Sequence, residues 1–306
     1  MSAELSVVTG GGGFIGSHLV ERLLAEGRRV RVVDNFSTGR RSIVPPGADL
    51  LEGDVNDVAP EAVLGASVVY HLAALPSVPR SVKQPLESHR ATAQGTLAVL
   101  AAAERAGVRR VVFASSSSVY GDTPTLPKHE GMPPRPLSPY AAAKLSGENY
   151  ARSWADHTKL ETVSLRFFNV YGPRQDPDSP YAAVIPIFLR RLRQGAPMPV
   201  YGDGGQTRDF TFVADVVQGV ILAASATGVS GRVYNIAGGR PVSVIDLGRT
   251  LARLLGRAPE FEFRPPRAGD IRDSFAEVAA ARRDLGFEAA VTLEEGLRRT
   301  LERSGT

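Results

Sequence analysis

The stretch Leu5-Ser-Val-Val-Thr-Gly-Gly-Gly-Gly-Phe-Ile-Gly16 decides how this chain folds. Its Val-rich start predicts a strand over Leu5–Thr9, and the apolar spacing that follows predicts a helix over Ser17–Ala25. Glycines between strand and helix let the backbone approach a pyrophosphate closely, and the first N–H groups of the helix attract its charge. The stretch therefore predicts the phosphate-binding turn of a dinucleotide. The glycines that carry this spacing are Gly10, Gly13 and Gly16.

Further apolar runs follow, separated by segments with helical spacing. Strands that alternate with helices in this way favour an α/β fold with a doubly wound, parallel, seven-stranded sheet of the Rossmann type. The six strands expected after the first are Arg29–Asp34, Asp49–Asp54, Val68–Leu72, Val111–Ala114, Glu161–Phe167 and Arg232–Ala237.

The composition changes at Asn169, where segments rich in Gly, Pro and Asp begin. Such segments are typical of loops over a pocket. We expect residues 1–168, with roughly 209–237, to form the cofactor-binding domain. We expect residues 169–208 and 238–306 to form a smaller C-terminal α/β substrate lobe, with the substrate cleft between lobe and sheet.

The bulk composition excludes several classes of function. The chain has 306 residues, of which 43% are hydrophobic and 22% charged, as in a soluble globular protein. It has no Cys and its five His are scattered, so we expect no disulfide and no metal site. The net charge of +4 is spread along the chain, which argues against nucleic acid. No apolar run is long enough for a membrane span and no signal peptide is evident, so we expect a cytoplasmic protein.

Asp34 ends the second predicted strand, 18 residues after Gly16. A carboxylate there can bind the ribose diol of an adenosine and would repel a 2′-phosphate, which favours NAD over NADP. The neighbouring Arg40 and Arg41 could tolerate such a phosphate, and a simple turn-forming Asp is the other interpretation.

Tyr140 and Lys144 stand four residues apart, after Ser138 and Pro139, which are typical of a helix start. On one helix face the ammonium would meet the phenol and lower its pKa from about 10, which would make Tyr140 a general base. Only four of the 36 basic Lys and Arg residues are Lys, so a Lys at this position indicates a need for a compact ammonium. The alternative is a surface helix with a solvated Lys.

Four hydroxyls, Ser115 to Ser118, follow the fifth predicted strand. They form either a polar loop or a site in which one hydroxyl bonds the reacting oxygen beside Tyr140.

Taken together, these motifs resemble the extended short-chain dehydrogenases/reductases, and more narrowly the nucleotide-sugar 4-epimerases of the UDP-glucose and UDP-N-acetylglucosamine type. The resemblance runs from Ser6 to about Leu285. The motifs that carry it are Thr9-Gly-Gly-Gly-Gly-Phe-Ile-Gly-Ser-His-Leu19, His71-Leu-Ala-Ala74, Ser115–Gly121, the stretch around Tyr140 and Lys144, Arg166-Phe-Phe-Asn-Val-Tyr-Gly-Pro173 and Gly202-Asp-Gly-Gly-Gln-Thr-Arg-Asp-Phe-Thr211.

The resemblance implies tightly bound NAD, a 4-keto sugar that turns about its diphosphate, and a catalytic set of Ser116, Tyr140 and Lys144, with Ser117 as the alternative serine. It implies that Asn169, Arg208 and Arg267 bind the diphosphate. The implied cofactor-binding residues are Gly10, Gly13, Phe14, Ile15, Gly16, Asp34, Asn35, Ser37, Gly39, Asp54, Val55, Leu72, Ala73 and Ala74, with Tyr140 and Lys144. The implied substrate-binding residues are Ser77, Ser116, Ser117, Asn169, Val184, Tyr201, Arg208, Arg267, Asp270 and Ser274.

Two positions discriminate among relatives. Ser118 stands where related dehydratases and decarboxylases carry a Glu, which ranks an epimerase above a dehydratase. Ser274 stands where epimerases limited to plain hexoses tend to carry a bulky aromatic, so N-acetylated sugars should also fit. The remaining alternatives are a UDP-glucuronate 4-epimerase, another NAD-dependent nucleotide-sugar epimerase or dehydratase, a reductase with net cofactor turnover, and a non-catalytic NAD-binding regulator. The resemblance also implies a homodimer through the helices near Thr92–Arg105 and Tyr140–His157.

Overall fold

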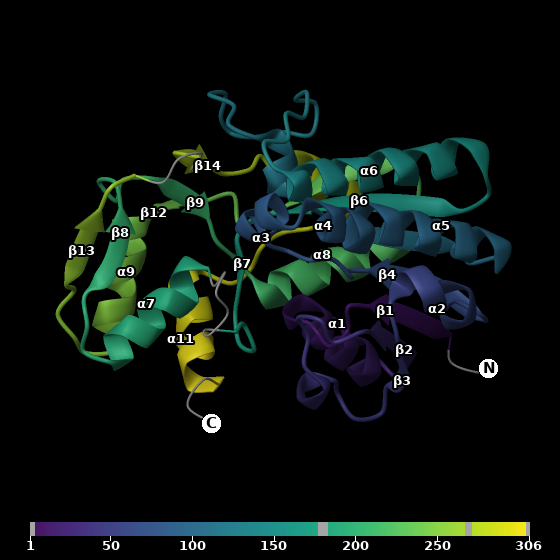
Figure 1. Cartoon of the computed structure of the whole chain (residues 1–306), viewed down its shortest axis with the longest axis horizontal. Helices are drawn as coiled ribbons and strands as arrows, with labels where there is room; N and C mark the ends of the chain where they lie inside the picture. The colour runs from purple at the N-terminus through teal and green to yellow at the C-terminus, as the bar shows by residue number, and fades with distance from the viewer. Residues whose placement is uncertain (1–3, 177–182, 267–270, 304–306) are drawn as a thin grey trace.

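The computed structural model describes residues 4–176, 183–266 and 271–303. Its centre is a parallel sheet of seven strands in the order β11-β6-β5-β4-β1-β2-β3 (Figure 1). This order, with β1 inside and the chain winding outward in both directions, confirms the doubly wound sheet. The strands are β1 (Leu5–Thr9), β2 (Arg29–Asp34), β3 (Asp49–Glu52), β4 (Ala66–His71), β5 (Arg110–Ser116), β6 (Glu161–Phe167) and β11 (Arg232–Ile236).

The strand positions agree with the predicted ones, and the ends differ for identifiable reasons. β3 ends at Glu52 because Asp54 serves as the N-cap of α2, where its carboxylate accepts the N–H of Asn56. β5 continues to Ser116, two residues beyond the predicted end, because Ser115 and Ser116 still pair with β6.

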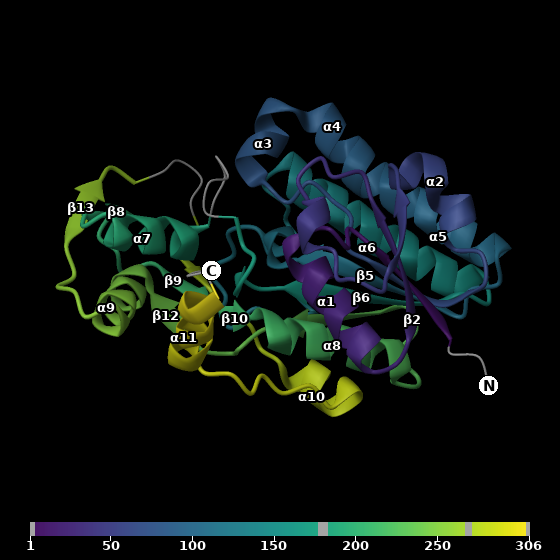
Figure 2. The same ribbon diagram turned by 90° about the horizontal axis from the view of Figure 1, so that it is seen from below.

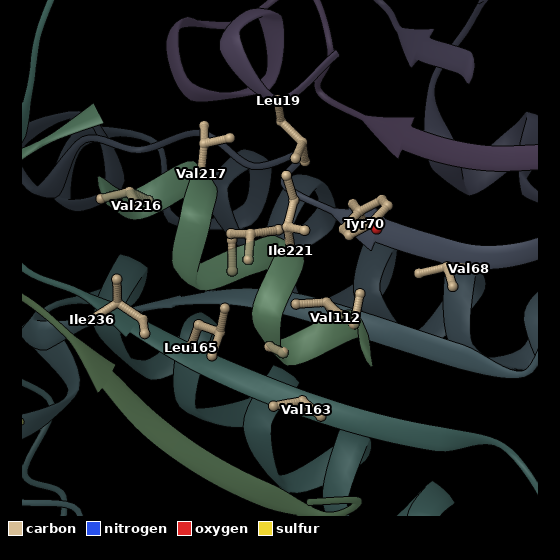
Figure 3. Close-up of a cluster of buried hydrophobic side chains, with 14 of the residues drawn as sticks. Leu19, Val68, Tyr70, Val112, Val163, Leu165, Val216, Val217, Ile221 and Ile236 are labelled. Atoms are coloured by element: carbon tan, nitrogen blue, oxygen red, sulfur yellow. The ribbon is translucent and has the colours of Figure 1, made fainter. Parts of the chain in front are cut away.

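Helices cover both faces of the sheet (Figures 1 and 2). One face carries α1 (Phe14–Ala25) and α8 (Val213–Ser225). Figure 3 shows this core, where Leu19 of α1 and Ile221 of α8 pack with Val112 and Leu165 of the sheet. Burial of such side chains contributes roughly 1.5 to 3 kcal/mol each. The other face carries α2 (Val55–Ala62), α5 (Gly95–Arg105) and α6 (Pro139–His157), with α3 (Val78–Lys83), α4 (Pro85–His89) and the π-helical segment η2 (Arg90–Gln94) before α5.

A smaller lobe lies beside the carboxyl ends of the strands (Figure 1). Its own apolar core joins helices and short strands that come from separate parts of the chain. Its helices are α7 (Val184–Arg193), α9 (Val244–Leu254) and α11 (Leu293–Arg303), and its strands are β7 (Val170–Tyr171), β8 (Met198–Tyr201), β9 (Thr207–Asp209), β10 (Thr211–Phe212), β12 (Pro241–Ser243), β13 (Phe261–Arg264) and β14 (Asp273–Ser274).

Two segments differ from the expected division of the chain. Strand β10 was expected in the cofactor-binding domain, but its Phe212 is buried in the core of the lobe. Helix α10 (Ala279–Leu285) was expected in the lobe, but it packs on β11 and α8 (Figure 2). Its Ala281 and Leu285, with Phe287, are buried in the core of the sheet face. The chain therefore returns to the sheet before α11 re-enters the lobe.

The described residues include neither a membrane-spanning helix nor a cluster of metal-ligating side chains. None of the described helices is both long and apolar enough to cross a membrane. Within the same part of the chain, no group of three acidic, His or Cys side chains could hold a metal ion.

Candidate active site

The glycine turn between β1 and α1 is built for close approach of a ligand. A Cβ added to Gly10 would lie 2.9 Å from the backbone nitrogen of Ala73, and one on Gly13 would lie 3.1 Å from the carbonyl oxygen of Gly10. Among the described residues, no side chain caps the N-terminus of α1. The first N–H groups of this helix are therefore available to an anion, as a pyrophosphate site requires.

Asp34 lies directly beside this turn. Its carboxylate accepts N–H bonds of 2.8 Å from both Gly12 and Phe36. Burial raises its pKa, and these two N–H groups oppose the rise. Each carboxylate oxygen keeps a further acceptor site, so a ribose diol can still donate to Asp34.

The two arginines that left NADP open are both engaged elsewhere. Arg41 forms an ion pair with Glu52, and its guanidinium lies 5.1 Å from the ring centre of Phe36. Arg40 donates to the carbonyl of Arg174 at 3.4 Å. The carboxylate of Asp34 therefore dominates the ribose end of the site, which suits NAD.

The loop that follows β2, residues 35–39, is held by local hydrogen bonds. The side chain of Asn35 accepts the N–H of Ser37 at 3.1 Å and donates to Asp54 at 3.3 Å. Gly39 packs against the carbonyl of Gly12, where a Cβ would come within 2.7 Å. The predicted residues of this part of the site are thus brought together.

A buried histidine fixes the end of β4, where a cofactor should pass. His71 is fully buried, with its Nδ1 2.7 Å from Thr9 Oγ1 and its Nε2 3.1 Å from Thr96 Oγ1. Thr96 gives its proton to the carbonyl of Thr92 in η2, so Nε2 must carry the hydrogen and Nδ1 must accept from Thr9. Thr9 in turn accepts the N–H of Ala73 at 3.2 Å. Burial, aided by the charge of Lys144, lowers the pKa of His71 to about 3.

Ser116 and Tyr140 meet at the carboxyl end of β5. Ser138 caps α6 by accepting the N–H of Ala141 at 3.1 Å, and this places Tyr140 in the first turn of the helix. Tyr140 is partly buried, and this burial raises its pKa to about 12, while a hydrogen bond with Ser116 opposes the rise. Of the two candidate serines, Ser116 is therefore the one that lowers the pKa of the phenol.

The prediction that Lys144 lowers the pKa of Tyr140 is wrong, because burial raises that pKa. The Nζ of Lys144 donates to the carbonyl of Ala114 at 2.6 Å and lies 6.0 Å from the centre of the Tyr140 ring. Burial lowers the pKa of Lys144 to about 7, with the carboxylate of Glu148 opposing. Loss of water around the phenol thus outweighs the attraction of an ammonium at this distance.

A buried ion pair beneath Lys144 was missed from the sequence. Glu148, one helical turn after Lys144, receives two bonds from Arg166 of β6, at 2.9 and 2.6 Å, and one from the hydroxyl of Ser115 at 2.5 Å. The guanidinium of Arg166 also stacks 4.5 Å from the ring centre of Tyr120. The Arg within the predicted strand Glu161–Phe167 was the available signal, because a charge in a central strand needs a partner.

A cavity of about 230 Å³ opens between the end of β6 and the lobe. Four predicted substrate residues line it, which are Asn169, Val184, Tyr201 and Arg208. Gln175 also lines it, and its buried Oε1 has no hydrogen-bond partner among the described residues. This concave site with a few polar groups fits a nucleotide.

The remaining predicted substrate residues differ in how the structure treats them. Ser274 is buried in β14 and pairs in register with Arg208 of β9. The hydroxyl of Ser77 accepts the N–H of Arg80 at 3.1 Å and so caps α3. Arg267 and Asp270 lie outside the described residues.

Comparison with known proteins then identifies the family. Residues 6–237 match the model of the NAD dependent epimerase/dehydratase family. The chain belongs to this family. It is 40% identical over 308 residues to a UDP-glucose 4-epimerase of Mycolicibacterium smegmatis, with 97% of each protein covered.

Solved structures of this epimerase/dehydratase family share the fold over nearly the whole chain. A UDP-N-acetylglucosamine 4-epimerase from Methanobrevibacter ruminantium, in complex with UDP-N-acetylmuramic acid, is 35% identical with a TM-score of 0.95 and 99% of each chain covered. MoeE5 in complex with UDP-glucuronic acid and NAD is 41% identical with a TM-score of 0.89 and 98% of each chain covered.

The epimerase/dehydratase family implies NAD, and the residues present fit it. The close glycine turn, the uncapped start of α1 and the carboxylate of Asp34 match a pyrophosphate next to a ribose diol. Leu72, Ala73 and Ala74 follow the carboxyl end of β4, next to the glycine turn that follows β1. Tyr140 and Lys144 lie on α6, which packs on the neighbouring strand β5. The enzyme is NAD-dependent.

Proposed function

We propose that this protein is a UDP-hexose 4-epimerase that interconverts UDP-glucose and UDP-galactose, and also UDP-N-acetylglucosamine and UDP-N-acetylgalactosamine. The observation that carries the proposal is that Ser116, at the end of β5, lies close enough to Tyr140, in the first turn of α6, to lower the pKa of its phenol. β5 is separated from the glycine turn of β1 only by β4. The proposed base for a sugar hydroxyl thus lies at the carboxyl ends of the strands, as the dinucleotide turn does.

The side chains around Tyr140 have distinct roles in this proposal. Tyr140 takes the proton from the O4 hydroxyl of the sugar and later returns it, while Ser116 donates a hydrogen bond to the oxygens involved. Lys144 supplies positive charge below them and orients the ribose. When bound, NAD⁺ accepts and returns a hydride at C4 and adds a positive charge that favours the phenolate of Tyr140.

The cavity beside the lobe would hold the nucleoside diphosphate. Val184 and Tyr201 wall the space for the uracil, and Asn169 and Arg208 face the diphosphate. A guanidinium suits this place because it grips phosphate through two parallel hydrogen bonds. On the resemblance alone, we assign Arg267 to the diphosphate and Asp270 to the substrate without a stated partner.

The range of sugars rests on Ser274. Its side chain is small and buried, and its backbone lies in register with that of Arg208, a proposed diphosphate ligand. A small residue there leaves room for an N-acetyl group. Similarity to a UDP-N-acetylglucosamine 4-epimerase supports this range.

A second candidate is epimerisation of UDP-glucuronate at C4. The observation in its favour is the 41% identity to MoeE5, which was solved in complex with UDP-glucuronic acid and NAD. The experiment below includes this substrate for that reason.

The test is incubation of the purified protein with UDP-galactose, UDP-N-acetylgalactosamine or UDP-glucuronate, without added NAD. We expect the first two sugars to reach equilibrium with their 4-epimers while the absorbance of reduced nicotinamide stays constant. In a parallel incubation with added NADH, stoichiometric consumption of the NADH would refute the epimerase in favour of a reductase. Turnover of the uronate alone would establish the second candidate.

We also propose a homodimer in the cytoplasm, with the fold divided at the boundaries expected above except for β10 and α10. Exposed apolar side chains support a dimer, with Val82 63% and Leu86 84% exposed on the helices next to α6. Light scattering of the purified protein measures the mass, and cell fractionation measures the location. A monomer over the working concentration range would contradict the dimer.

A further inference from the structure

Ser118, which stands where related dehydratases carry a Glu, forms two hydrogen bonds with Ser116. We propose that Ser118 is a positioning residue whose N–H and hydroxyl fill the acceptor sites of Ser116, so that Ser116 can only donate, and its one proton is directed toward the phenol oxygen of Tyr140. The inference rests on the proposed function and deepens it.

The hydrogen bonds at Ser116 carry the argument. Ser118 donates twice to Ser116 Oγ, from its N–H at 3.2 Å and from its hydroxyl at 2.9 Å. A serine hydroxyl has two acceptor sites and one proton. Both acceptor sites are thus filled, and the proton of Ser116 is the only part left for Tyr140. A donor to the phenol oxygen stabilises the phenolate, which is the form a base needs.

The turn that follows β5 holds Ser118 in place. Residues Ser117–Tyr120 form a single 3₁₀ turn with Ser116 as its N-cap. Val119 and Tyr120 are buried, and the Tyr120 hydroxyl donates to Asn235 of β11 at 2.7 Å. The side chain of Ser118 therefore stays fixed relative to Ser116.

The charged and titratable groups packed around this site do not involve Ser118. Lys144 and Glu148 lie on α6, Arg166 lies on β6, and the neutral His71 lies on β4. Substitution of Ser118 leaves all four in place, so a change in the titration of Tyr140 would report the lost hydrogen bond.

The experiment compares Ser118→Ala, which removes the hydroxyl, with Ser118→Thr, which keeps it. Ser146→Ala is the control, because it removes a hydroxyl from α6 that bonds only its own helix. For Ser118→Ala we expect kcat to fall by about threefold to tenfold, the loss for one hydrogen bond between neutral groups. The pH at which kcat rises should increase by about half to one unit, because the phenolate loses support. Ser118→Thr and the control should follow the wild type.

Direct titration separates this inference from the proposed function. The phenolate absorbance of Tyr140 is measured in the NAD-loaded enzyme, as the difference from Tyr140→Phe, with melting temperatures to verify folding. An upward shift of the Tyr140 pKa in Ser118→Ala supports the inference even if no offered sugar is epimerised. An unchanged pKa overturns it, even if the enzyme is an epimerase. A faster Ser118→Ala enzyme also overturns it, since the bond would then run from Ser116 to Ser118.

Discussion

The neutral His71 makes a prediction about stability in acid that can be worked out from the structure. Its pKa is lowered from 6.5 to about 3 by burial and by Lys144. Between these values the unfolded chain binds a proton that the folded chain does not, so folding loses stability as the pH falls below 6.5. One pH unit corresponds to about 1.36 kcal/mol, so the loss at pH 5 should be about 2 kcal/mol.

The perturbation is His71→Asn, which cannot titrate. Its amide oxygen can still accept from Thr9, but the bond to Thr96 and the stacking on Phe113 at 5.8 Å are lost. We therefore expect the variant to be about 2 to 4 kcal/mol less stable at pH 8. This gap should shrink by about 2 kcal/mol at pH 5, because only the wild type has the acid-sensitive group.

The assay is denaturant unfolding at several pH values between 5 and 8. The single Trp, Trp154, is half-buried on α6 and provides the fluorescence signal. Other titrating groups cancel in the difference between the two proteins. His157→Asn, at the exposed end of α6, is the control and should follow the wild type. A gap between wild type and His71→Asn that stays constant from pH 8 to pH 5 would refute the reasoning.

Three further substitutions test the site. Tyr140→Phe should lower kcat by about 10² to 10⁴ with UDP-sugar affinity retained, since the phenol acts on the transferred proton, and wild-type turnover would reject the assignment. Ser274→Tyr should lower kcat/KM for N-acetylated sugars more than for plain hexoses, because Ser274 adjoins Arg208; equal losses would contradict this. Arg166→Met should cost about 3 to 5 kcal/mol, because Glu148 stays buried without its cation, and an unchanged denaturation midpoint would disprove it.

Much of the fold could be predicted because its strands and helices follow short periodic patterns of apolar residues along the chain. Alternating apolar runs and helical spacing located all seven strands of the sheet to within about two residues. The glycine turn, Asp34, and the four-residue step from Tyr140 to Lys144 are also local patterns. The sequence could not place α10, whose partners are β11 and α8 rather than its neighbours in the lobe.

The chemistry of the site depended on the tertiary structure. The same Tyr140 and Lys144 that share a helix face do not set each other's pKa, because Lys144 turns to the carbonyl of Ala114 and burial acts on both. The pairing of Glu148 with Arg166 joins α6 to β6 across intervening chain.

The sequence alone thus determined the succession of strands and helices along the chain, the glycine turn after β1 and the candidates for the reactive side chains. The tertiary structure decided which of these side chains lose water, which hydrogen bonds orient them, and how segments from both halves of the chain line one cavity. The physical reason is that periodicity and capping act between near neighbours, whereas desolvation and charge pairing depend on residues far apart in the chain.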